Sequence, residues 1–168
     1  MVSNGGFEGD AVTTPTFQYM CPTSWTCFAC TTSMCGGAVL VMRSDTAWGG
    51  GGAPSGSYYL GIQGSTSYIN QQLQLNRELT LMLQFTARNR PGYGTATLTI
   101  SLGDTSVWSG IPPTSWSTYQ APISATANSA LLQFTTIYSS GNSEVTIQVD
   151  DIMLCSTLYL LGGVCNGM

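Results

Sequence analysis

Apolar and polar residues alternate with a period of two through most of the chain after residue 37, and this pattern constrains the fold more than any other feature. In residues 78–88, Leu79, Leu81, Leu83 and Phe85 share one face, while threonine, methionine and glutamine take the other. Such alternation predicts a half-buried strand. The sequence predicts strands at residues 2–8, 38–43, 58–63, 68–75, 78–88, 96–103, 106–109, 118–124, 130–138 and 145–149.

Clusters of glycine, proline, serine and asparagine separate these strands, and no segment has a sustained helical periodicity. About ten short strands separated by turns predict an all-β fold, a two-sheet antiparallel β-sandwich of the jelly-roll type. We expect one domain at residues 1–154 and a C-terminal tail at residues 155–168. Within the domain, residues 11–37 are polar and cysteine-rich, and we expect them to form an inserted loop held by its own disulfides.

Charged residues make up only 7% of the 168 residues, and the formal net charge is -4. The four cationic residues are arginines without a basic cluster, so no basic stripe can neutralise a phosphate backbone or an anionic lipid surface. No apolar run approaches the length of a membrane span. We therefore expect no nucleic-acid partner and no membrane span.

The even number of cysteines favours disulfides, and hence a secreted or extracellular protein. The six cysteines are Cys21, Cys27, Cys30, Cys35, Cys155 and Cys165. We expect a bond between Cys155 and Cys165, because both flank one short excursion after the last strand, and the pairing of the other four stays open. A four-thiolate zinc site built on Cys27 and Cys30 is the alternative, since the chain has no histidine. The chain starts without a signal-peptide pattern, so we interpret it as a mature or excised domain.

Short motifs at both ends carry a family resemblance. Residues 4–8 read N-G-G-F-E, residues 149–154 read V-D-D-I-M-L, and between them stand the strand motifs of residues 56–61 and 69–73 and the W-S-T-Y of residues 116–119. In their order and spacing these motifs resemble galactose-binding-like jelly-roll domains, including many carbohydrate-binding modules and related plant cell-wall domains. The cysteine cluster and the tail from Cys155 depart from that pattern.

The resemblance implies that the first and last strands are neighbours and that a structural calcium ion lies between them. Calcium takes about six to eight hard oxygen ligands, mixing carboxylates with carbonyls. The matching positions are Glu8 and Asp151, with Asp150 as an alternative and Asp45 as a further ligand from the next loop. Otherwise these residues are ordinary acids at strand ends.

No catalytic arrangement is visible in the sequence. The absence of histidine excludes Ser-His-Asp and Cys-His centres, and neither a G-x-S-x-G nor a P-loop motif is present. The acids outside the suspected calcium site lie next to turns rather than as a recognisable carboxylate pair. We expect a protein that is not an enzyme.

The polar faces of the predicted strands are rich in glutamine. Amide groups supply the paired donors and acceptors that a hydroxyl-rich ligand needs, and we expect Gln72, Gln84, Gln133 and Arg88 to contact a glycan. The alternative is that glutamine and threonine merely cover the solvent side of a sheet without charge.

Aromatic side chains near loops are the second group of candidate ligand contacts. Trp48 lies beside a glycine run, Tyr93 lies in a P-G-Y-G turn and Trp108 lies near a loop, so we expect all three to be exposed and able to stack on a sugar ring.

Two hypotheses of function follow from these observations. The first is a non-catalytic carbohydrate-binding module that recognises an extracellular glycan. The alternative is a structural or adhesive domain that packs against neighbouring proteins in an extracellular or particle assembly, with no sugar ligand. The absence of lysine and the small number of charges favour the second hypothesis.

Overall fold

The computed structural model describes residues 1–13, 16–28, 37–49, 52–77, 80–138 and 145–156. Eleven strands lie in these ranges, one more than the approximate number expected. They are β1 (Phe17–Tyr19), β2 (Thr26–Cys27), β3 (Gly37–Met42), β4 (Tyr58–Gln63), β5 (Tyr68–Gln74), β6 (Thr80–Asn89), β7 (Thr97–Leu102), β8 (Thr105–Gly110), β9 (Ser117–Ser124), β10 (Ser129–Ile137) and β11 (Thr146–Ser156).

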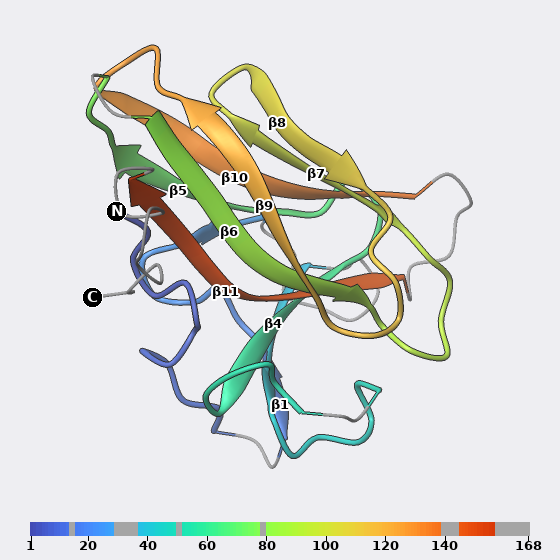
Figure 1. Ribbon diagram of the computed structural model, residues 1–168. Coiled ribbons are helices and arrows are strands. Elements are labelled where there is room, and N and C mark those ends of the chain that lie inside the picture. The colour runs from blue at the N-terminus through green and yellow to red at the C-terminus, as the bar shows by residue number, and fades with distance from the viewer. Residues whose placement is uncertain (14–15, 29–36, 50–51, 78–79, 139–144, 157–168) are drawn as a thin grey trace.

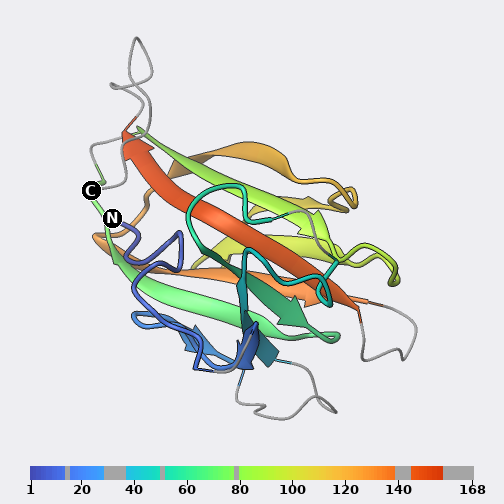
Figure 2. The same cartoon turned by 90° about the horizontal axis from the view of Figure 1, so that it is seen from below.

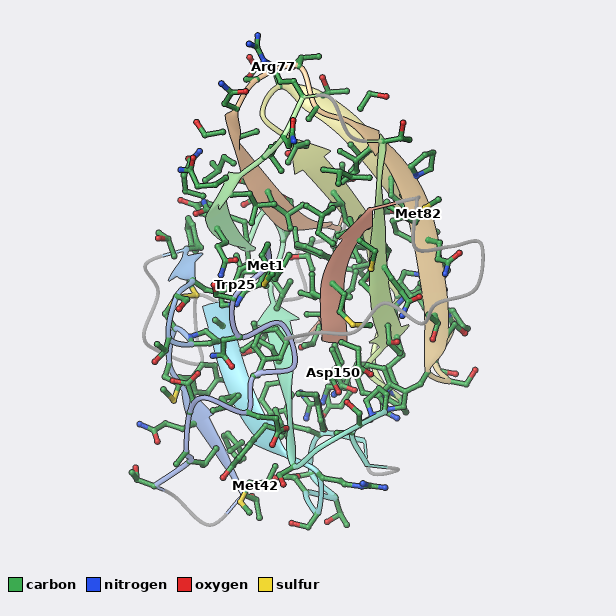
Figure 3. The ribbon with its side chains drawn as sticks, turned by 60° about the vertical axis from the view of Figure 1, so that its left-hand side comes forward. Met1, Trp25, Met42, Arg77, Met82 and Asp150 are labelled. Atoms are coloured by element: carbon green, nitrogen blue, oxygen red, sulfur yellow. A yellow bond between two sulfur atoms is a disulfide. The ribbon has the colours of Figure 1, made fainter. Side chains whose placement is uncertain are left out.

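The strands form two antiparallel sheets that pack against each other (Figures 1 and 2). One sheet has six strands in the order β1-β3-β4-β11-β6-β9, and the other has five in the order β2-β5-β10-β7-β8. Arg77 and Met42 mark opposite ends of the sandwich, with Asp150 between them (Figure 3). The two-sheet antiparallel sandwich is thereby confirmed. None of the described residues belongs to a helix that could span a membrane.

The main core lies between the sheets and uses the apolar face of each alternating strand. Leu83 and Phe85 of β6 face Ile100 of β7 and Phe134 of β10, and all four side chains are fully buried. Burying one such side chain is worth roughly 1.5–3 kcal/mol. The period-two pattern therefore determines which face of each sheet turns inward.

A second apolar cluster covers part of the outer face of the six-stranded sheet. Val39 and Val41 of β3 and Tyr59 of β4 pack there against Trp48 and Ala53 of the segment between these strands. The sequence of β3 is GAVLVM, and an uninterrupted apolar run is typical of a strand that is buried on both faces. On the outer face of the five-stranded sheet, none of the described residues forms such a cover over β5, β7 and β10, and burial alternates along each of these strands.

Two expectations about the N-terminal part are wrong. Residues 2–8 form turns rather than a strand, because Asn4 and Phe7 have positive φ angles of 50° and 59°, which no extended strand accommodates. Residues 11–37 are not simply a loop, since β1 and β2 form within them.

The N-terminal segment nonetheless lies beside β11, as the resemblance implied (Figures 1 and 2). The amide of Ile152 donates to the carbonyl of Gly5 at 3.0 Å. The pairing of β11 with β6 is irregular between Asp150 and Met153, and Asp151 has a positive φ of 51°. A β-carbon at Gly5 would lie 1.9 Å from the Ile152 carbonyl oxygen, so only glycine allows this approach.

Candidate functional site

The outer face of the five-stranded sheet presents a regular array of uncharged polar side chains, which we call the amide face. Its central row runs across the strands through directly paired residues, and parallel rows flank it. The central row consists of Thr26, Asn70, Gln133, Ser101 and Ser106, and the flanking positions are Tyr68, Thr135, Thr99 and Ser109 on one side and Gln72 and Leu131 on the other.

Hydrogen bonds link some of these side chains to one another. Asn70 Nδ2 donates to Gln133 Oε1 at 3.4 Å, and Gln133 Nε2 donates to Thr135 Oγ1 at 3.0 Å. The hydroxyls of Thr99 and Ser109 lie 3.2 Å apart. These contacts fix the orientation of the amides and leave further donor and acceptor positions for a ligand, since each amide can make about four hydrogen bonds.

An aromatic pair stands at the β2 edge of the amide face. Phe28 is 38% exposed, and its ring centroid lies 5.8 Å from that of Tyr68 in an edge-to-face arrangement. Such a pair offers a rigid apolar surface beside the polar rows.

The amide face is built entirely from strands without charged residues. None of β2, β5, β7, β8 and β10 contains Asp, Glu, Lys or Arg, whereas β6 carries Arg88 and β11 carries Asp150 and Asp151. The face can therefore form neutral hydrogen bonds and stacking contacts, but no ion pairs from its own strands.

Two of the four polar residues expected at the site lie on the amide face. Gln72 is exposed there and Gln133 occupies its centre. Gln84 lies on the outer face of the other sheet, where it accepts a hydrogen bond from Gln120 Nε2 at 2.9 Å. The four residues thus belong to two sheets and do not form one site.

Arg88 is wrongly placed by the prediction, because it is only 4% exposed. Its guanidinium lies 4.5 Å from the ring centroid of Trp116 and 5.8 Å from that of Tyr59, and its Nε donates to Gln148 Oε1. Burial lowers the pKa of Arg88 and raises that of Tyr59 to about 12. Arg88 therefore packs between the buried ring of Tyr59 and the half-buried ring of Trp116 rather than facing a ligand.

The expected exposure of the aromatic residues holds for Tyr93 and fails for Trp48. Trp48 is 3% exposed and packs in the second apolar cluster. Tyr93 is 40% exposed. Its ring centroid lies 3.8 Å from the guanidinium carbon of Arg90, and the ring centroid of Trp48 lies 4.2 Å from the same carbon.

Trp108 is half-buried rather than exposed. Its ring centroid lies 5.2 Å from that of Phe85 and 4.9 Å from that of Tyr119, so it closes the core near β8 and β9. The three aromatic candidates therefore do not converge on one surface.

Phe28 and Asn70 belong to the amide face but were not among the candidate contacts. The alternation of β5 places Tyr68, Asn70 and Gln72 on one side, and this signal could have found Asn70. Phe28 follows a two-residue strand, which is too short for any periodicity to be read from the sequence.

Three of the four acids expected at a metal site gather where the N-terminal segment meets β11. Glu8 Oε1 accepts hydrogen bonds from the amides of Ser57 and Tyr58 at 2.8 and 2.9 Å, and Asp151 Oδ1 accepts one from the hydroxyl of Ser55. Asp150 lies beside them and is fully buried. Among the residues that the structure describes, no group of three or more Asp, Glu, Cys or His side chains is close enough together to hold a metal ion.

Asp150 has the features of a carboxylate that lacks a counter-charge. Its Oδ1 accepts the amide of Asp151 at 2.8 Å, and its buried Oδ2 has no hydrogen-bond partner. Burial, the charge of Asp151 and, to a smaller extent, that of Glu8 raise the pKa of Asp150 to about 8. A buried carboxylate oxygen without a partner, near the charges of two further carboxylates, is the kind of oxygen donor that calcium prefers.

Asp45 does not belong to this group. Its Oδ1 accepts the amide of Trp48 at 3.0 Å, and its charge acts on Tyr59 rather than on Asp150. It caps the turn that carries Trp48 into the second apolar cluster.

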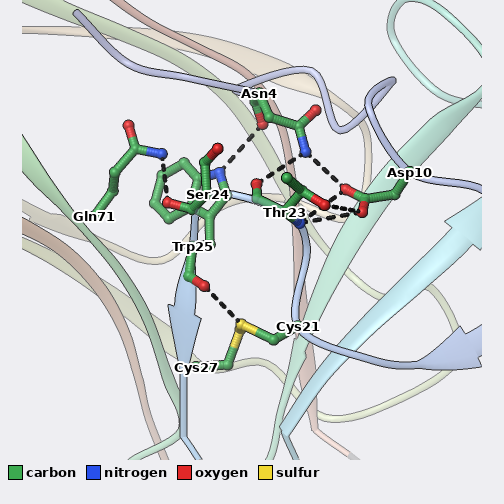
Figure 4. Close-up of a disulfide and its surroundings, with 8 residues drawn as sticks. All are labelled: Asn4, Asp10, Cys21, Thr23, Ser24, Trp25, Cys27 and Gln71. Carbon is green, nitrogen blue, oxygen red and sulfur yellow. Dashed lines mark hydrogen bonds between the residues drawn. A yellow bond between two sulfur atoms is a disulfide. The ribbon is translucent and has the colours of Figure 1, made fainter.

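The structure shows the disulfide state of three of the six cysteines. Cys21 and Cys27 form a disulfide (Figure 4), and Cys155 is disulfide-bonded as well. This contradicts a zinc site that uses Cys27. Cys30, Cys35 and Cys165 lie outside the described residues, so the expected bond between Cys155 and Cys165 stays a prediction.

Comparison with known proteins identifies solved structures that have the same fold. No protein-family model and no curated protein sequence matches the chain. The solved structure of TmCBM61 in complex with beta-1,4-galactotriose has a TM-score of 0.63 at 13% identity, over 92% of this chain and 97% of that one. The chain has the jelly-roll fold of carbohydrate-binding modules.

Other structures with this jelly-roll fold are similar to a comparable degree. The CBM22-1 xylan-binding domain of Paenibacillus barcinonensis Xyn10C has a TM-score of 0.55 at 13% identity, over 79% of this chain and 85% of that domain. The K2 cleaved adhesin domain of Lys-gingipain has a TM-score of 0.61 at 14% identity, over 88% and 94% respectively. At these identities the similarity establishes the fold and leaves the ligand open.

Proposed function

We propose that this jelly-roll domain is a non-catalytic carbohydrate-binding module that holds a neutral glycan chain on its amide face. The observation that carries the proposal is the row of Asn70, Gln133 and Ser101 on a sheet without charged strand residues, flanked by the Phe28–Tyr68 pair. Hydroxyl groups of a sugar pair with amides and hydroxyls, and its C–H face stacks on aromatic rings.

The solved structures support the same proposal. One similar module was solved with beta-1,4-galactotriose and another is a xylan-binding domain. Five strands at about 4.8 Å spacing make the amide face about 19 Å wide, which suits an extended chain rather than a single sugar. The absence of histidine from the whole sequence supports a role without acid–base catalysis by that residue.

Affinity electrophoresis on a panel of neutral and acidic polysaccharides tests the proposal. We expect retardation by a neutral polysaccharide, and Gln133→Ala or Asn70→Ala should weaken binding about three- to tenfold, since each removes neutral hydrogen bonds worth about 0.5–1.5 kcal/mol. Gln84→Ala is the matched control, because that amide lies on the other sheet and binding should be unchanged. Exclusive binding of acidic polysaccharides would contradict a neutral ligand.

We also propose that Glu8, Asp150 and Asp151 hold a structural calcium ion that joins the N-terminal segment to β11. The buried, unpartnered Oδ2 of Asp150 supports this proposal. The two positive charges of the ion would offset most of the negative charge of three neighbouring carboxylates, and the ion would supply no chemistry to a ligand.

The disulfides support an extracellular or otherwise oxidising compartment for this domain. Bonded cysteines at Cys21, Cys27 and Cys155 are typical of secreted proteins and rare in the cytosol.

Adhesion to a protein partner is the second candidate function. Leu131 and Ile137 are 36% and 48% exposed on the same outer face, and a cleaved adhesin domain shares the fold. If adhesion is the function, Ile137→Ser should abolish protein capture, and no polysaccharide should retard the domain. Retardation that Gln133→Ala weakens would instead favour the glycan.

A further inference from the structure

Strand β2 supplies the outermost column of the amide face. It pairs with β5 through only two residues, Thr26 opposite Asn70 and Cys27 opposite Ile69. Alternation therefore places Thr26 on the outer face beside Asn70, and Cys27 on the core side. The ladder continues one residue further, since the amide of Phe28 donates to the carbonyl of Tyr68 at 2.9 Å.

So short an edge strand has little stability of its own, because two residues form few ladder bonds and bury little surface. The Cys21–Cys27 disulfide closes the preceding loop at a sequence separation of six residues, directly before Phe28. Within that loop, which Figure 4 shows with its disulfide, Trp25 is 7% exposed. Its ring packs at the main core against Phe7 and Phe134.

Hydrogen bonds also connect the loop between Cys21 and Cys27 to the N-terminal segment and to β5. Trp25 Nε1 donates to the carbonyl of Asn4 at 3.2 Å, and Gln71 Nε2 donates to the carbonyls of Ser3 and Ser24 at 2.9 Å each. Asp10 accepts hydrogen bonds from Asn4 Nδ2 at 2.7 Å and from Thr23 Oγ1 at 2.8 Å. The loop is thus anchored before β2, and the disulfide connects this anchor covalently to Cys27.

We propose that the Cys21–Cys27 disulfide is a positioning element for glycan binding: it fixes β2 so that Phe28 stands against Tyr68 as the aromatic edge of the amide face. This inference rests on the proposed function and assigns the affinity-determining ring to Phe28. A ring that is held in place before binding loses less conformational freedom when the ligand arrives, so the bond raises affinity without touching the glycan.

A double-mutant cycle on the full chain tests the inference, with a neutral polysaccharide that retards the wild type as the probe. Phe28→Ala should weaken binding about five- to tenfold, and Phe28→Tyr should retain it, because both aromatic rings stack. Replacing Cys21 and Cys27 by alanine together should weaken binding to a similar extent. Adding Phe28→Ala to that variant should then change affinity less than twofold, since the ring is already misplaced.

The outcomes separate this inference from the proposed function. If Gln133→Ala weakens binding but Phe28→Ala does not, the assignment of Phe28 is overturned while the glycan face stands. If the effects of Phe28→Ala and the double cysteine variant simply multiply, the disulfide has only a structural role and the inference is overturned. If the cysteine variant does not fold, the contrast between Phe28→Ala and Phe28→Tyr still tests whether the aromatic ring at position 28 contributes to glycan binding. A wild type that no polysaccharide retards overturns both.

Discussion

At the scale of single residues, the carboxyl group of Asp150 combines complete burial with two neighbouring carboxylates, and this combination has consequences for stability. Its pKa of about 8 lies far above the value of about 3.9 in an unfolded chain. Between these two pH values the native state binds a proton that the unfolded state has released. The calcium-free protein should therefore lose stability as the pH rises from about 4 to about 8, by at most about 1.4 kcal/mol per pH unit.

Thermal unfolding at pH 5 and pH 8, with chelator or with calcium, measures this effect. With chelator the midpoint should be lower at pH 8, and calcium should raise it most at pH 8, where the ion replaces the proton. Asp150→Asn should be insensitive to calcium and lack this component of the pH dependence. An identical midpoint with and without calcium at pH 8 would refute the proposed ion.

Phe28 and Trp48 show at the same scale why aromatic residues resist assignment from sequence. Trp48 beside a glycine run looked exposed, yet its turn folds back over β4, where its ring lies against Gly61. Phe28 looked like part of a loop, yet one ladder bond to Tyr68 places it at the edge of a sheet. In each case a partner distant in sequence determines the exposure.

At the scale of elements, the contact between the N-terminal segment and β11 depends on one glycine. A β-carbon added at Gly5 would lie 1.9 Å from the carbonyl oxygen of Ile152, whereas one added at the adjacent Gly6 would lie 3.9 and 4.0 Å from carboxylate oxygens of Asp150 and Asp151. The two glycines thus differ in the space available to a side chain.

Gly5→Ala should destabilise the domain by about 1–3 kcal/mol, because the new methyl group forces the segment away from β11. Gly6→Ala is the matched control, and it should lower the free energy of unfolding by much less than Gly5→Ala does. Urea unfolding of both variants measures the difference. Equal midpoints would mean that the segment can leave β11 without loss of stability.

The strands themselves were largely predictable. Their period-two patterns place β4 through β10 within a few residues of the observed bounds, since alternation reports directly which side of a strand is buried. The strand expected at residues 2–8 is not formed. Two consecutive glycines and the positive φ angles of Asn4 and Phe7 favour turns in this segment.

At the scale of the whole molecule, the two sheets differ in what covers their outer faces. The segment between β3 and β4 brings Trp48 and Ala53 onto one sheet, whereas within the described part of the chain nothing comparable covers the amide face over β5, β7 and β10. The covered face contributes to stability, and the open face is available for recognition.

Trp48→Ala should therefore destabilise the protein by on the order of 3–5 kcal/mol, as expected for a buried ring, without a specific effect on glycan binding. Tyr93→Ala, which removes an exposed ring stacked on Arg90, should cost about 1 kcal/mol or less. Chemical denaturation together with affinity electrophoresis distinguishes the two roles. A stable Trp48→Ala variant that loses glycan binding would restore Trp48 as a ligand contact.

The sequence by itself determined the all-β sandwich and the absence of charge from most of its strands, and the resemblance carried by the terminal motifs implied the grouping of Glu8, Asp150 and Asp151. The first two properties follow from local composition and periodicity, which need no knowledge of strand order. Only the tertiary structure decided that Gln72 and Gln133 share a face while Gln84 lies on the other sheet and Arg88 is buried. Strand order is set by long-range pairing, such as Asn70 with Gln133, and no local pattern records which strands become neighbours.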